Sequence, residues 1–146
     1  MQAISAIRDV SHVVQLALAP VFLLVAIASM LNLFTNRLSR IIDRSRVLTN
    51  MLDSTPSDKQ ANIHAELVVL TRRSKHIGLA ITLCTTTALL VCTVVVILFL
   101  GNFFQFGIAI PIALLFITAM LLIVAAFLIF LREILIATAN LRIGPH

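Results

Sequence analysis

The residues best placed to do chemistry are three arginines in the segment RLSRIIDRSR, residues 37–46. Arg37, Arg40 and Arg44 are separated by three and four residues, so on a helix they lie within about 60° of one another and form one stripe. Such a stripe predicts docking of anionic lipid headgroups, at about 1 kcal/mol per basic residue, or pairing with an acidic partner. The alternative is solvated charge that serves only to orient the protein in a membrane.

The carboxylate closest to this chemistry is Glu133, in the segment FLREI (130–134). Its depth should match that of Arg37, so we consider an interfacial ion pair between Arg37 and Glu133 that locks the third helix to the first. A lone acid at a membrane interface is costly to leave unpaired, which favours a structural pair. A proton relay would need further carboxylates inside the apolar segments, and the sequence has none there.

No pattern in the sequence predicts catalysis, a metal or a cofactor. Cys84 and Cys92 lie eight residues apart inside one apolar run, too far apart along a helix for a disulfide. No nucleophile, base and orienting group occur together as an enzyme would require, so we expect a non-enzymatic protein. No two histidines share an i, i+4 helix face that could hold a metal: they are His12, His64, His76 and His146.

Small and polar residues mark the second apolar run. Ala80, Cys84, Ala88 and Cys92 recur every four residues, which predicts a helix–helix packing face, either internal or between subunits. Threonines decorate the same helix, and they either line a polar pore or bond back to the carbonyls of the preceding turn. They are Thr82, Thr85, Thr86, Thr87 and Thr93.

The elements that must position these residues are apolar helices. Of 146 residues, 60% are hydrophobic and only 12% charged, whereas a soluble domain is about a quarter charged. No Asp, Glu, Lys or Arg occurs between Asp9 and Arg37, or between Lys75 and Arg132. These lengths predict three membrane spans, at about 11–36, 77–100 and 108–131, with a turn at 101–107 that begins at Gly101. We expect a single all-α membrane domain over 1–146.

The distribution of basic residues predicts the orientation. Residues 37–75 hold eight of the eleven lysines and arginines, so this segment and the C-terminus should be cytoplasmic, with the N-terminus outside. Because these charges flank apolar spans, membrane topology explains the net charge of +5, and we expect no nucleic-acid partner.

Residues 37–76 are expected to form a cytoplasmic antiparallel helical hairpin that extends the first two spans. Residues 37–52 and 58–76 lack Gly and Pro, and STPSD (54–58) is typical of a turn. A seam with spacing 4, 3, 4, 3 runs along each arm. On this interpretation the arginine stripe lies about 130° from the seam and faces away from the hairpin partner. The first arm of the seam is Leu38, Ile42, Ser45, Thr49 and Leu52, and the second is Ile63, Leu67, Leu70, Ser74 and Ile77.

With these segments in view, the chain resembles a bacterial membrane family known as domain of unknown function 2721. The resemblance rests on APVFLL (19–24), NRLSRIIDRSRVL (36–48), ELVVLTRRSKHI (66–77) and FLREI (130–134). It implies a three-span protein of the bacterial inner membrane, and it implies no activity.

Three hypotheses follow for the function. The first is a membrane protein that assembles with itself or as an accessory subunit of a larger complex, through the small-residue face. The second is an oligomeric channel or small transporter lined by threonines or Asn32. The third is docking of anionic lipids or of a protein through the arginine stripe.

Overall fold

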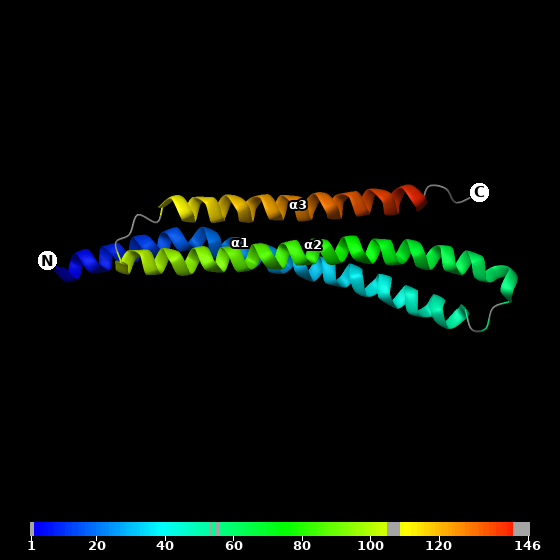
Figure 1. Cartoon of the computed structure of the whole chain (residues 1–146). Helices are drawn as coiled ribbons and strands as arrows, with labels where there is room; N and C mark the ends of the chain where they lie inside the picture. The colour runs from blue at the N-terminus through cyan, green and yellow to red at the C-terminus, as the bar shows by residue number, and fades with distance from the viewer. Residues whose placement is uncertain (1, 53, 55, 105–108, 142–146) are drawn as a thin grey trace. The chain divides into compact units, whose positions relative to one another are not determined.

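The described part of the chain is helical apart from Ser54 and Pro56, which lie between the first two helices. The computed structural model describes the chain except residues 1, 53, 55, 105–108 and 142–146. The described residues form α1 (Gln2–Leu52), α2 (Ser57–Phe104) and α3 (Ala109–Leu141), which Figure 1 shows in chain order from blue to red. The helices have 51, 48 and 33 residues, whereas helices of globular proteins average about 10–14. Each is long and apolar enough to cross a membrane, as in a multi-pass membrane protein.

The helix ends differ in one respect from the sequence prediction. We expected the second span to end at Gly101, but α2 continues through this glycine to Phe104. A glycine inside a helix costs only about 1 kcal/mol, which is too little to end a long helix by itself. Pro111 lies in the first turn of α3, where its missing N–H costs little. Gly144 and Pro145, a pair typical of a helix stop, lie outside the described residues.

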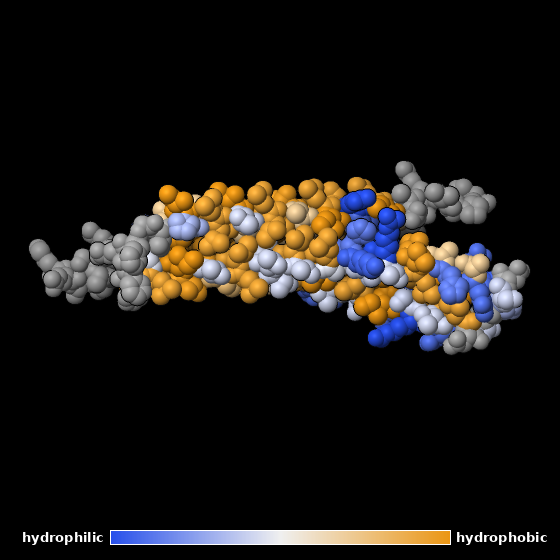
Figure 2. Space-filling view, in the orientation of Figure 1, coloured by the Kyte–Doolittle hydropathy of each residue, from blue (hydrophilic) through white to orange (hydrophobic). Residues whose placement is uncertain are grey.

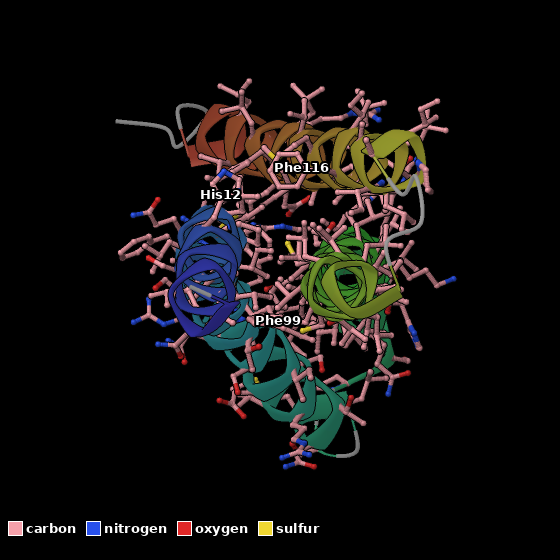
Figure 3. The ribbon with its side chains drawn as sticks, turned by 90° about the vertical axis from the view of Figure 1, so that its left-hand side faces the viewer. His12, Phe99 and Phe116 are labelled. Carbon is pink, nitrogen blue, oxygen red and sulfur yellow. The ribbon has the colours of Figure 1, made fainter. Side chains whose placement is uncertain are left out.

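Tertiary contacts divide the chain into two units, which we describe separately. Unit 1 combines Met1–Met30 with Leu83–Val124. Its core contains Ile27 of α1 and Ala119 of α3, together with residues of α2: Cys84, Thr87, Val91 and Val94. In the end-on view of Figure 3, His12 and Phe99 are exposed, whereas Phe116 of α3 is half-buried. Large apolar side chains such as Phe22 also face outward, and the face in Figure 2 is correspondingly orange. Such a surface suits lipid.

Unit 2 combines Leu31–Thr82 with Ala125–His146. On α1 its buried residues recur every seven positions, at Phe34, Ile41 and Leu48, and on α2 they include Leu70 and Ile77. A seven-residue repeat is the pattern of helices that pack side by side in a left-handed coil. Hydrophilic colour in Figure 2 gathers over this unit, which holds most of the charged residues.

The packing seam on α1 corrects the sequence prediction by one position. Leu38, Ser45 and Leu52 are half-buried as expected, but the expected Ile42 and Thr49 are exposed. Ile41 and Leu48 are buried in their place. The expected and the observed seam both have heptad spacing, so spacing alone does not distinguish them. Helix α1 also contacts α3, where Phe34 packs against the ring of Phe130. On α2 the seam is the expected one, with Leu70 and Ile77 buried and the other three residues half-buried.

Candidate functional site

A buried ion pair joins α2 to α3 within unit 2. Glu133 is only 3% exposed, and the Nε of Arg73 donates a hydrogen bond of 2.5 Å to its Oε1. The Arg73 side chain is 30% exposed, so its guanidinium reaches from the interior toward the surface. A buried carboxylate requires such a partner, because an uncompensated charge in this environment costs several kcal/mol.

The expected pair between Arg37 and Glu133 is therefore wrong in its partner. The guanidinium carbon of Arg37 lies 5.1 Å from the centre of the Phe130 ring, in cation–π range. Phe130 precedes Glu133 by about one helical turn on α3. Arg37 therefore contacts α3 through the Phe130 ring, and the Glu133 carboxylate pairs with Arg73 instead.

The arginine stripe lines a groove between α1 and α2, which we call the arginine groove. Its volume is about 400 Å³. Arg44 also pairs across this interface with Glu66 of α2, with 3.0 Å between Nη2 and Oε1. The lining residues are Arg37, Arg40, Ile41 and Arg44 of α1 with Leu70, Arg73 and Ile77 of α2.

The prediction that the stripe faces away from α2 is consequently wrong. The buried line runs through Ile41 and Leu48 rather than Ile42 and Thr49, which turns the interface by about 40° toward the arginines. Arginine side chains are long, so from this flank they reach over the interface. The structure thus brings Arg37, Arg40 and Arg44 together with Arg73.

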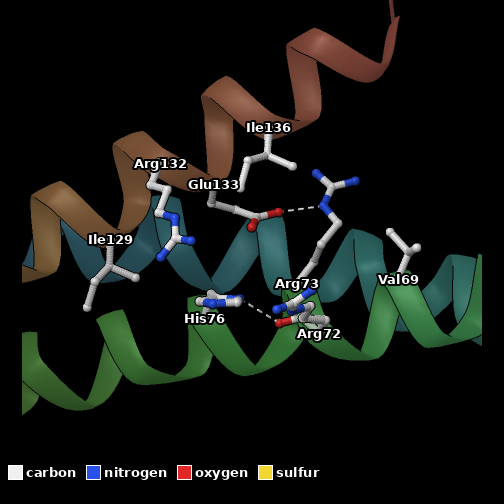
Figure 4. Close-up of a pocket in the computed structure, with 8 residues that line it drawn as sticks. All are labelled: Val69, Arg72, Arg73, His76, Ile129, Arg132, Glu133 and Ile136. Atoms are coloured by element: carbon white, nitrogen blue, oxygen red, sulfur yellow. Dashed lines mark hydrogen bonds and ion pairs between the residues drawn. The ribbon is translucent and has the colours of Figure 1, made fainter.

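A more compact pocket lies between α2 and α3, and we call it the α2–α3 pocket (Figure 4). Its volume is about 280 Å³. Helix α2 contributes Val69, Arg72, Arg73 and His76. Helix α3 contributes Ile129, Arg132, Glu133 and Ile136. The Nδ1 of His76 donates to the carbonyl oxygen of Arg72 at 2.8 Å, which fixes the ring beside the pocket.

Sequence reasoning did not predict that α2 supplies the basic partner of Glu133. The signal was present in TRRSKH (71–76), which precedes the second apolar run as RLSR (37–40) follows the first. Both segments should lie at the same depth relative to the membrane, so Arg73 is as plausible a partner for Glu133 as Arg37. Among the described residues, no group of three His, Cys, Asp or Glu is placed to hold a metal ion.

The small residues that recur every four positions on α2 pack in the interior only at the N-terminal end of their stripe. Ala80 and Cys84 are fully buried, Ala88 is half-buried and Cys92 is exposed. Residues four apart drift by about 40° on a helix with 3.6 residues per turn. The stripe therefore leaves the interior and emerges at Cys92.

Several polar residues of the apolar segments bond within their own helix. The Oγ1 atoms of Thr82, Thr87 and Thr93 donate to the carbonyl oxygens of the residues four positions earlier, at 2.8–3.0 Å. Such bonds to the preceding turn are the second of the two interpretations of the threonines, the first being a pore lining. Asn32 is exposed and accepts a hydrogen bond from Asn36 of its own helix at 3.4 Å. Its amide thus has a local partner rather than one on a second helix.

The comparisons with known proteins give a family. The family model described as "Protein of unknown function (DUF2721)" matches residues 17–143, which includes most of both units. No curated protein matches the chain, and no solved structure does.

Proposed function

Because the chain belongs to the DUF2721 family, whose description states no activity, we propose a function from the geometry of the chain alone. We propose a non-enzymatic protein of the bacterial inner membrane that docks anionic lipid headgroups in the arginine groove. The observation that carries the proposal is the gathering of four arginines around one groove: Arg37, Arg40, Arg44 and Arg73.

The charges around the groove leave a net attraction for anions. Glu66 offsets Arg44, and Glu133 offsets Arg73. Among the described residues, no carboxylate forms an ion pair with Arg37 or Arg40. At about 1 kcal/mol per basic residue near an anionic surface, two uncompensated arginines provide about 2 kcal/mol, or roughly thirtyfold in affinity.

The groove also combines charge with apolar surface. Ile41, Leu70 and Ile77 form part of its lining, so a lipid can place its phosphate among the guanidiniums and the first carbons of its acyl chains against these apolar residues. The proposal includes the orientation that the basic residues favour, in which residues 37–76 form a cytoplasmic hairpin. The groove then lies at the leaflet where anionic headgroups meet juxtamembrane arginines.

Lipid selectivity in a bilayer tests the proposal. The full chain is reconstituted into phosphatidylcholine with trace spin-labelled phosphatidylglycerol or phosphatidylcholine, and the motionally restricted fraction of each label is measured. We expect preferential restriction of phosphatidylglycerol, weakening as salt rises because salt screens exposed charge. Equal restriction of both labels at low salt would overturn the proposal.

A matched pair of variants locates the selectivity. Arg40→Gln should reduce affinity at the groove by about fivefold, the equivalent of one basic residue. Arg46→Gln removes the same charge from an exposed position on α1 that lines neither the groove nor the α2–α3 pocket. Equal losses in the two variants would show that overall charge, rather than the groove, selects the lipid.

Self-assembly is a second candidate, favoured by the position of Cys92. This residue continues the small-residue stripe onto the exposed surface of α2, where a second helix backbone could approach closely. Cys92→Leu should then lower the particle mass in mild detergent, whereas Thr93→Leu, at an exposed position about 100° around the helix from Cys92, should not. A mass unchanged by Cys92→Leu would count against assembly through this face.

A further inference from the structure

We propose that the α2–α3 pocket is a second lipid site, separate from the arginine groove, and that it binds the phosphomonoester headgroup of a phosphatidate-class lipid. The groove gives a general attraction for anionic headgroups. The pocket has the charge, the donors and the size to recognise one kind of phosphate.

The net charge of the pocket matches a phosphomonoester. Its lining contains three guanidiniums, those of Arg72, Arg73 and Arg132, and the carboxylate of Glu133. Two positive charges therefore remain after Glu133 is paired with Arg73. A phosphomonoester carries about −1.5 to −2 at neutral pH and balances them. A phosphodiester such as phosphatidylglycerol carries a single negative charge and leaves an excess of positive charge.

The donors come from both walls of the pocket. Figure 4 shows Arg72 on α2 and Arg132 on α3, with the bonded Arg73 and Glu133 beside them. The ion pair holds Arg73 in place, whereas Arg72 and Arg132 are exposed and can each present a fork of N–H groups to an anion. The three unesterified oxygens of a phosphomonoester can accept from two such forks at once.

The size and the lining indicate a ligand carried by a lipid. A volume of about 280 Å³ lies just below the usual range of small-molecule pockets, about 300–1,000 Å³. It accommodates a headgroup rather than a partner helix. Val69, Ile129 and Ile136 provide apolar walls around the charged residues, and a soluble phosphate ester would leave these walls without a contact.

The pocket and the groove can be tested independently. Arg132 lines the pocket and not the groove, and α1 contributes to the groove and not to the pocket. Native mass spectrometry of the full chain in detergent measures dissociation constants for phosphatidate, for phosphatidylglycerol and for glycerol 3-phosphate. We expect phosphatidate to bind most tightly, and Arg132→Gln to weaken its binding about tenfold or more through loss of charged hydrogen bonds. Arg132→Lys should weaken it less, and the control Arg46→Gln should match the parent.

Each outcome bears on the proposal. Equal affinity for phosphatidate and phosphatidylglycerol would overturn it while leaving general anionic docking in the groove intact. A phosphatidate preference that survives Arg132→Gln would overturn the assignment to this pocket. Glycerol 3-phosphate binding as tightly as phosphatidate would overturn the lipid as the source of the phosphate. Helical circular dichroism of each variant verifies that the exposed Arg132 has been replaced without unfolding the chain.

Discussion

Removal of Arg73 should destabilise the protein more than removal of its partner Glu133. The Glu133 carboxylate is 3% exposed, so Arg73→Gln leaves a buried charge without compensation, at a cost of about 3–5 kcal/mol. Glu133→Gln leaves Arg73 instead, whose side chain is already 30% exposed and can extend its charge into water. Its cost should be the loss of one charged hydrogen bond, about 1.5–3 kcal/mol.

The free energy of unfolding can be measured by circular dichroism in mixed micelles as a denaturing detergent is increased. The double variant Arg73→Gln with Glu133→Gln removes both charges, and its cost should be well below the sum of the two single costs. Arg37→Gln is the matched control. It removes a guanidinium that lies over Phe130 rather than beside Glu133, and it should cost about 0.5–2 kcal/mol.

Two results would refute this reasoning. If Glu133→Gln cost as much as Arg73→Gln, the asymmetry of burial would not govern the pair. If Arg37→Gln cost as much as Arg73→Gln and the double variant were additive, Arg37 would be the partner of Glu133 that the sequence first indicated.

Further variants probe the remaining packing. Cys84→Leu should destabilise the chain by about 1–3 kcal/mol, because it adds volume at a fully buried position, and the same unfolding measurement checks this against the exposed Cys92→Leu. Phe130→Leu should cost about 1–3 kcal/mol, since the ring contacts Phe34 and Arg37; the exposed Phe127→Leu should cost much less, and equal losses would contradict the aromatic contact. Thr87→Val should change stability by less than about 0.5 kcal/mol, because its hydroxyl bonds within its own helix. If vesicles containing the parent protein showed ion flux that Thr87→Val abolished, the hydroxyl would line a pore after all.

The sequence predicted the features that depend only on the order of charged and apolar residues along the chain. Long stretches without charge, between Asp9 and Arg37 and between Lys75 and Arg132, are sufficient to predict apolar helices. The need of Glu133 for a basic partner likewise follows from its place at the end of the third apolar run.

The features that the sequence did not predict depend on how each helix is rotated about its axis. Arg37 and Arg73 both match Glu133 in depth, and in the structure Arg37 lies over the Phe130 ring whereas Arg73 bonds the carboxylate. Ile41 and Ile42 are adjacent, so a seam with heptad spacing can pass through either residue. This shift of one position decided whether the arginine stripe borders α2.

The seven-residue recurrence of buried side chains in unit 2 limits how this region can change in length. Phe34, Ile41 and Leu48 lie on one face of α1, as do Leu70 and Ile77 on α2. Deletion of a single residue would rotate every position beyond it by about 100° and bring polar side chains into the interior. Deletion of seven residues from each arm, such as 45–51 together with 58–64, would bring Leu52 to the position of Ser45 and preserve both faces. Length variants of this region should therefore be tolerated in steps of seven residues, with matching changes in both arms.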